Sequence, residues 1–267
     1  MNIVIFDTET VNLQKPYMYN LGYIIYDTTD GKVLCEREFV VEQIWNNRPL
    51  FDSAYYADKR PLYISGMRGR KITLAKYGHI MTKLINDIKA YQVDGAYAFN
   101  SAFDEKVFEF NADYYHCRNG LDGTPIFDIR AYACNNERLL NKLKKFADGA
   151  SKEVENKFFT DADGYKTTAE SFTCMLKNDY EYNEEHTALA DSRIELEVLK
   201  ECLADGMELN KVYDCPRSFP RGEKPLKKLT IKVDGQVAYA YDNLTSLLVR
   251  KGSSKTDGET TIYLKTK

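Results

Sequence analysis

The sequence predicts an α/β protein with a mixed sheet flanked by helices, followed by a small β-rich appendage at the C-terminal end. Three observations support this fold class. Residues 1–41 show strand patterns, residues 73–206 alternate between helix and strand patterns, and a segment rich in proline and glycine precedes renewed alternation of polar and apolar residues.

The N-terminal region is expected to form three strands. Residues 2–6 are almost wholly apolar and predict a short buried strand. Residues 20–27 and 33–41 alternate as strands and flank Asp30-Gly31, a dipeptide typical of tight hairpin turns. A meander of antiparallel strands therefore opens the chain.

Helices and strands then alternate. Residues 42–70 are less regular, whereas residues 73–91 carry apolar side chains at helical spacing and predict a helix. A strand is expected over 95–100, a helix from about Ser101, and a short strand over 126–130. This alternation is typical of a sheet that includes parallel strands.

The last part of the body is predicted to be mainly helical. We expect a helix over 136–147, a hairpin over 157–170 and a short helix over 171–177. A longer helix over 191–206 should end at Gly206, because glycine readily adopts the left-handed conformation that terminates helices.

Charge and turn residues suggest two domains, a body over 1–210 and a β-rich module over 217–267. The net charge is -3, but residues 211–267 carry 12 Lys or Arg against 6 Asp or Glu, which leaves the body acidic. The module is expected to help hold nucleic acid, although a solvated basic surface or a protein-docking role stays open. Its entrance is basic, with Arg217, Arg221, Lys224, Lys227, Lys228 and Lys232.

Composition argues against a membrane protein and a disulfide scaffold. No apolar run reaches about 18 residues, and Met1 leads directly into a strand, so neither a membrane span nor a signal peptide is expected. The six cysteines are scattered without a C-x-x-C pair. Free thiols in a reducing cytoplasm are the expectation, and protein partners are not indicated.

Two carboxylates at the end of the first strand carry the first functional signal. Asp7 and Glu9 leave the same face of the strand, because side chains alternate along it. Two neighbouring anions at a buried strand are unfavourable unless a positive charge joins them.

A second signal lies at the last long helix. Asp191 falls within roughly 20° of Val198 and Cys202 on the helical wheel, so it faces the core, although an acid near a helix N-terminus is also favourable in itself. His186 stands five residues earlier, about 140° away. It can share a site with Asp191 if it lies on the loop before the helix, and an ordinary hydrogen-bonded histidine is the alternative.

The fourth acid follows the strand over 95–100. Ser101 and Asp104 can form a capping box, which would hold Asp104 at the carboxyl end of a strand, where α/β sheets place ligands. If the strands are neighbours, Asp7, Glu9, Asp104 and Asp191 converge. Two Mg²⁺ or Mn²⁺ ions would offset their repulsion, and paired ions of this kind cleave phosphodiesters.

Three segments resemble the motifs of the DEDDh family of 3′→5′ exonucleases. They are FDTET at Phe6, AFNSAFD at Ala98 and HTALADSRIE at His186, in the family's order and covering roughly residues 1–205. The resemblance implies a ribonuclease-H-like fold. The chain departs from the family at Val11-Asn12, where a glycine is common, and in the length of residues 42–75.

The resemblance also implies roles for the acids and the histidine. Asp7 would bridge two metal ions, and Glu9 and Asp191 would complete one site. Asp104 would hold the second ion, partly through water. His186 would be the general base that takes a proton from the attacking water.

Three further residues are expected to bind substrate. The resemblance places the backbone of Thr8 at the terminal nucleotide and Asn100 close to the substrate backbone. Phe103 could stack on an unpaired base, although packing on Val107 in the core is the stronger alternative.

The predicted function is therefore a metal-dependent 3′→5′ exonuclease. It would act on single-stranded nucleic acid with a free 3′ end, DNA in preference to RNA, and release 5′-mononucleotides. The alternative is a catalytically silent nucleic-acid-binding or scaffolding domain. A sugar or phosphate-ester hydrolase is not favoured, because the sequence has no nucleophile motif of the G-x-S-x-G kind.

Overall fold

The computed structural model divides the chain into two compact units, Met1–Ser218 and Phe219–Lys267. It describes residues 1–162, 164–216 and 219–221, together with the backbone of four strands further along. The boundaries predicted for the two domains, and the separate roles predicted for them, stay predictions.

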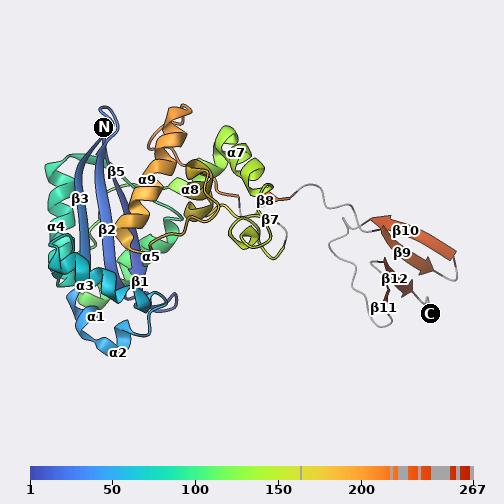
Figure 1. Ribbon diagram of the computed structural model, residues 1–267, viewed down its shortest axis with the longest axis horizontal. Helices are drawn as coiled ribbons and strands as arrows, with labels where there is room; N and C mark the ends of the chain where they lie inside the picture. The colour runs from blue at the N-terminus through green and yellow to red at the C-terminus, as the bar shows by residue number, and fades with distance from the viewer. Residues whose placement is uncertain are drawn as a thin grey trace. The chain divides into compact units, whose positions relative to one another are not determined.

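A six-stranded mixed sheet forms the centre of the first unit (Figure 1). Its order is β4-β3-β2-β1-β5-β6. The β1–β2 and β2–β3 pairs are antiparallel, and the β1–β5, β5–β6 and β3–β4 pairs are parallel. The predicted mixed α/β sheet is thereby confirmed. The strands are β1 (Asn2–Thr10), β2 (Met18–Asp27), β3 (Lys32–Val41), β4 (Thr73–Ala75), β5 (Val93–Ala98) and β6 (Ile126–Asp128).

Helices cover both faces of this sheet (Figure 1). One face packs against α4 (Tyr77–Ala90) and α5 (Ala102–Tyr115), and buries Val4 and Phe6 of β1. The other face buries Ile3 and Ile5, as the alternation of a strand requires. The helices over that second face are α6 (Ile129–Asn135), α7 (Glu137–Ala147), α8 (Ala169–Lys177) and α9 (Ala188–Ala204).

Between β3 and β4 the chain forms a helical insertion, residues 42–72. It consists of α1 (Glu42–Asn46), α2 (Arg48–Phe51), the 3₁₀ turn η1 (Ala57–Lys59) and α3 (Arg60–Arg68). Its aromatic core is buried. Trp45 meets Phe51 edge-on at 5.0 Å between ring centroids, Tyr63 packs beside them, and the Arg60 guanidinium lies 3.8 Å from the centre of the Trp45 ring. The insertion therefore packs as part of the first unit.

Several predicted boundaries were wrong. β1 runs on to Thr10, because its pairing with β2 continues past Phe6, so Asp7 and Glu9 lie within the strand. Thr73–Ala75 forms an edge strand beside β3 instead of starting a helix. The helix α6 was not predicted, and α9 begins three residues earlier than expected, at Ala188. Gly206 ends α9 with a positive φ of 84°, which confirms its predicted role.

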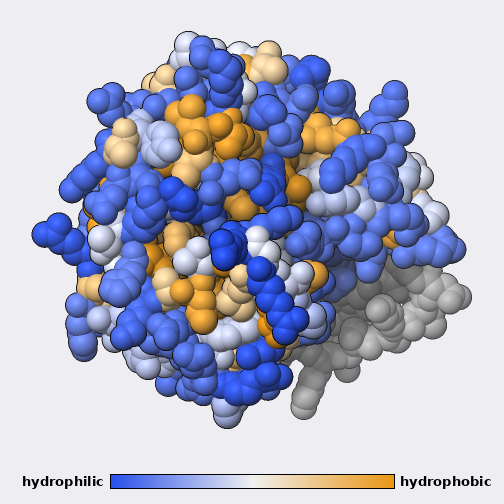
Figure 2. Space-filling model, turned by 60° about the vertical axis from the view of Figure 1, so that its left-hand side comes forward, coloured by the Kyte–Doolittle hydropathy of each residue, from blue (hydrophilic) through white to orange (hydrophobic). Residues whose placement is uncertain are grey.

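The rest of the first unit includes the 3₁₀ turn η2 (Glu155–Lys157) and the two-residue strand β7 (Gly164–Tyr165). All six cysteines lie among the described residues and are free thiols. In the part of the chain that the structure describes, no helix is long and apolar enough to span a bilayer. The face in Figure 2 is mostly hydrophilic, with apolar residues in small separate patches.

The second unit contains the short strand β8 (Phe219–Pro220) and a four-stranded sheet of order β10-β9-β12-β11. Its strands are β9 (Lys228–Val233), β10 (Gln236–Tyr241), β11 (Ser253–Thr256) and β12 (Glu259–Leu264). The pairing of β9 with β10 is antiparallel, as a hairpin requires. Apart from Arg221, the side chains of the predicted basic entrance lie outside the described residues.

Candidate active site

The first two predicted ligands project from the centre of the sheet. Asp7 and Glu9 share the face of β1 that carries Ile3 and Ile5, the face covered by α9. Their neighbours on β2 are Gly22, opposite Asp7, and Asn20, opposite Glu9. β1 and β5 run parallel, so their carboxyl ends form the edge at which α/β sheets bind ligands.

A glycine on β2 allows α9 to approach these carboxylates. A Cβ atom on Gly22 would lie 2.1 Å from the backbone nitrogen of Leu189, so no other residue fits without moving the helix. Ser192 Oγ donates a hydrogen bond of 3.2 Å to the Gly22 carbonyl. The first turn of α9, which includes Asp191, is therefore held directly against the strand opposite Asp7.

The buried side chain of Asn20 fixes the start of the same helix. Its Oδ1 accepts hydrogen bonds from the Ala188 backbone N–H (2.8 Å) and from the Tyr63 hydroxyl (3.1 Å). Its Nδ2 donates to the Phe39 carbonyl at 2.8 Å. One amide thus joins β2, β3, the insertion and the N-terminus of α9, where unpaired N–H groups need acceptors.

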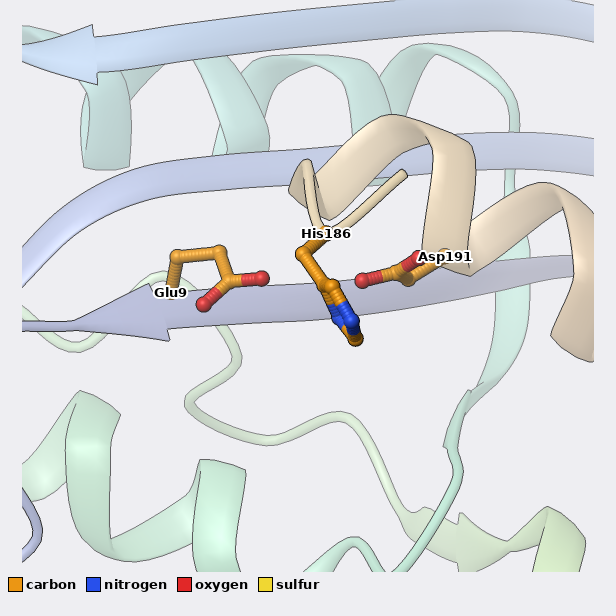
Figure 3. A group of neighbouring side chains, drawn as sticks. All are labelled: Glu9, His186 and Asp191. Atoms are coloured by element: carbon orange, nitrogen blue, oxygen red, sulfur yellow. The ribbon is translucent and has the colours of Figure 1, made fainter. Parts of the chain in front are cut away.

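His186 lies on the loop before α9, which confirms its predicted location. Its backbone is left-handed, with φ of 57°. Figure 3 shows the imidazole between the carboxylates of Glu9 and Asp191. One potential ligand atom from each of these three residues lies within 4.8 Å of the other two. Five residues of separation thus still allow a shared site, because the helix begins after His186.

The insertion contributes an aromatic ring to this cluster. Tyr56 stacks on the His186 imidazole, with ring centroids 4.1 Å apart and planes 12° from parallel. On the ring edge, His186 Nδ1 lies 3.8 Å from Glu184 Oε2. Tyr55 meets Tyr56 edge-on and is 86% exposed, so an accessible aromatic surface borders the histidine.

Asp104 reaches the cluster from the first turn of α5. Its Oδ1 accepts a hydrogen bond of 2.6 Å from Thr8 Oγ1, which projects from the other face of β1. The predicted capping box was wrong, because Ser101 makes no side-chain cap and its hydroxyl donates to Glu105 instead. Thr8, and not Ser101, therefore holds Asp104 in place.

The four carboxylates of the cluster repel one another. Glu9 and Asp104 are buried, and Asp7 and Asp191 are partly exposed. Burial, and then the negative charges around each group, raise the pKa values of Asp7 and Glu9 well above their usual range. Burial likewise raises the pKa of Asp104 and of Asp191 to about 7. Among the described residues, no lysine or arginine forms an ion pair with any of these four acids.

The three predicted substrate-binding residues lie in different environments. The Thr8 side chain is buried and is used to hold Asp104. Asn100 is exposed at the end of β5, with φ of 63°, and its N–H donates to Asp128 Oδ1 at 2.8 Å. Phe103 is partly buried and packs against the core, as its alternative interpretation stated. Their proposed contacts with substrate stay predictions.

Sequence reasoning missed two acids of the cluster and the contact of Tyr56 with His186. Glu195 and Glu184 are carboxylates that face the predicted ligands, and Tyr56 stacks on His186. The spacing of Glu195, four residues after Asp191, was an available signal because such residues share a helix face. Tyr56 lies 130 positions before His186, and no local pattern links the two.

The donor set suits a hard divalent cation. Asp191 Oδ1, Glu184 Oε1 and Glu195 Oε2 are buried oxygens without a hydrogen-bond partner in the described structure. All are carboxylate oxygens, the ligands that Mg²⁺ and Mn²⁺ prefer. Cations here would remove both the mutual repulsion and the unmet hydrogen-bonding capacity.

Comparison with solved structures identifies proteins that share this fold. No protein-family model and no curated protein matches the chain. The nuclease domain of 3′hExo, a DEDDh family member solved bound to rAMP, superposes with a TM-score of 0.52 and 12% identity, over 79% of this chain and 96% of its own. A 3′-exonuclease solved in recognition of the histone mRNA stem-loop superposes with a TM-score of 0.51 and 11% identity, over 91% and 92% of the two chains. These likenesses confirm the predicted ribonuclease-H-like exonuclease fold.

Proposed function

We propose that this protein is a metal-dependent 3′→5′ exonuclease that hydrolyses single-stranded nucleic acid to 5′-mononucleotides. The observation that carries the proposal is the cluster of carboxylates without cationic partners, together with one histidine, at the carboxyl ends of β1 and β5. The fold shared with solved 3′-exonucleases supports it. A silent binding domain would have no need for six acids and a base in one place.

In this proposal Asp7, Glu9, Asp104 and Asp191 hold two Mg²⁺ or Mn²⁺ ions. When bound, such ions supply Lewis-acid stabilisation of charge on the scissile phosphate. Thr8 orients Asp104 through its hydroxyl. The acids themselves stay ionised once cations offset the repulsion that raises their pKa values.

His186 accepts the proton of the attacking water. Burial, and next the charge of Lys59, lower the pKa of the imidazole, so the ring is neutral and able to accept a proton at neutral pH. Because Nδ1 faces Glu184, Nε2 is the atom left to take the proton. The Tyr56 ring holds one face of the imidazole and limits its rotation.

The substrate is proposed to be a single strand with a free 3′ end, with DNA preferred to RNA. The acidic cluster recognises phosphate only through cations, since a carboxylate alone repels it. The solved relatives are described with rAMP and with histone mRNA, so both nucleic acids belong in the test. Glu9 and the Thr8 backbone are proposed to meet the terminal 3′-hydroxyl.

The test uses single-stranded DNA and RNA of one sequence, each with labelled phosphate at the last internucleotide linkage. With Mg²⁺ or Mn²⁺ the full chain should release a labelled 5′-mononucleotide first, and excess EDTA should stop release. A 3′-phosphate should block it, and Asp7→Ala should abolish it. Cleavage in EDTA would refute the metal mechanism, and efficient cutting of a circular strand would show an endonuclease instead.

A further inference from the structure

Glu195 is a carboxylate at the site beyond the four proposed metal ligands, and the function proposed above gives it no role. It lies on α9 one turn after Asp191, on the same face of the helix. Side chains of a helix tilt toward its N-terminus, so Glu195 leans toward the turn that carries Asp191. Its side chain is only 3% exposed.

The surroundings of Glu195 supply only part of what a buried carboxylate needs, a hydrogen bond from the backbone of Phe99. Its Oε2 has no hydrogen-bond partner, and no lysine, arginine or histidine among the described residues forms an ion pair with it. Burying an isolated carboxylate costs several kcal/mol, and such groups normally pair or coordinate metal. The neighbouring α9 glutamate, Glu197, shows the ordinary arrangement, an exposed ion pair with Lys200 at 2.8 Å.

What Glu195 faces is the other acids. Of the charges around Asp7, that of Glu195 raises its pKa the most, after burial itself. Asp104 and Asp191 act on Glu195 in the same way, and burial is again the larger cause of its raised pKa. Together with the one-turn spacing from Asp191 and the 3% exposure, these interactions agree with a Glu195 carboxylate directed into the acidic cluster.

A purely structural role accounts poorly for these features. A glutamate kept only for packing would leave one of its buried oxygens without a hydrogen-bond partner, which is costly. A cation would instead satisfy that oxygen directly. The same cation would reduce the repulsion between Glu195 and Asp7.

We propose that Glu195 is a further metal ligand, whose carboxylate binds one of the two divalent cations together with Asp7. This inference rests on the proposed function. The proposed ligands are then five carboxylates from three elements, β1, α5 and α9. The fifth ligand raises the affinity of the site for the ion, because each added anionic oxygen ligand strengthens binding of a hard cation.

The test measures Mn²⁺ binding to the full chain directly, by the loss of the free-ion signal in electron paramagnetic resonance. Glu195→Gln keeps the side-chain shape and removes the charge, and Glu197→Gln is the matched control on the same helix. We expect Glu195→Gln to weaken one Mn²⁺ site at least tenfold, with Glu197→Gln unchanged.

Unchanged Mn²⁺ affinity in Glu195→Gln would overturn the inference and leave the proposed function standing. Absence of Mn²⁺ binding to the wild-type chain would refute the proposed function itself. Should Glu195→Gln fail to fold, Glu195→Asp serves, since it keeps the charge but withdraws the carboxylate by one methylene. Equal affinity in that variant would overturn the inference as well.

Discussion

Two regions of the first unit bury carboxylates in opposite ways. Asp87 on α4 is 4% exposed, yet both of its oxygens are used. Lys83 Nζ donates to Oδ1 at 2.7 Å, and Arg37 Nε and the Tyr23 hydroxyl each donate to Oδ2 at 2.8 Å. Burial raises its pKa, but these donors outweigh burial and the pKa lies below its usual value.

The four acids over β1 have no lysine or arginine partner among the described residues, and their pKa values are raised. Asp87 has cationic donors on both oxygens, and this pairing stabilises the fold. The carboxylates around Asp7 lack such donors, so bringing them together is unfavourable until a cation binds. The difference distinguishes a structural acid from the acids proposed to act in catalysis, and the following predictions test it.

The largest expected effect is on catalysis. His186→Ala should fold normally and bind metal, but slow mononucleotide release by roughly 10²–10⁴, the usual range for loss of a general base. Single-turnover rates at saturating metal measure this. His79→Ala, at an exposed position on α4, is the matched control and should retain full activity. If the His186→Ala protein is unfolded, His186 has a structural role and not the proposed catalytic one.

Asp87→Asn should destabilise the protein by about 2 kcal/mol, because it removes the charge that Lys83 and Arg37 share. Activity of the folded protein should be unchanged. Since the folded pKa of Asp87 is lowered, its contribution is present above about pH 4 and is lost as the pH falls through the folded value. Urea unfolding at pH 7 and at pH 3 would measure both effects, and equal losses at the two pH values would contradict the argument.

The contribution of the carboxylates around Asp7 to stability should depend on pH in the opposite direction to that of Asp87. With folded pKa values of about 7 for Asp104 and Asp191, the metal-free protein should be most stable below about pH 4 as far as these groups are concerned, and lose that contribution as the pH rises through 7. Asp191→Asn should therefore stabilise metal-free protein at pH 8 by about 1 kcal/mol. Thermal unfolding in EDTA measures this, and destabilisation at pH 8 would show that the cluster is already satisfied.

The smallest effect is expected at Tyr56. Loss of one ring stack is worth about 1 kcal/mol, so Tyr56→Ala should lower kcat about fivefold while KM stays near the wild-type value. Tyr56→Phe keeps the stack and should keep the rate. Tyr55→Ala distinguishes the alternative in which these rings bind an unpaired base, since that would raise KM. A fall in kcat for Tyr56→Phe would assign the effect to the hydroxyl.

Local physics explains why much of the site could be predicted. Alternation along a strand is independent of the rest of the chain, so Asp7 and Glu9 had to share a face once β1 existed. A helix turns 100° per residue, so His186 and Asp191 could meet only if the helix started after the histidine, and it does. The mixed sheet followed from the order of strand and helix patterns.

The remaining features depend on contacts between distant segments. Pairing with β2 extended β1 past Phe6, and Gly22 let α9 lie against that pair closely enough to add Asp191 and Glu195 to the cluster. Tyr56 reaches His186 through the folding of an insertion with its own aromatic core. Strand register and helix approach are set by which distant surfaces pack together, and a local sequence pattern carries no record of that choice.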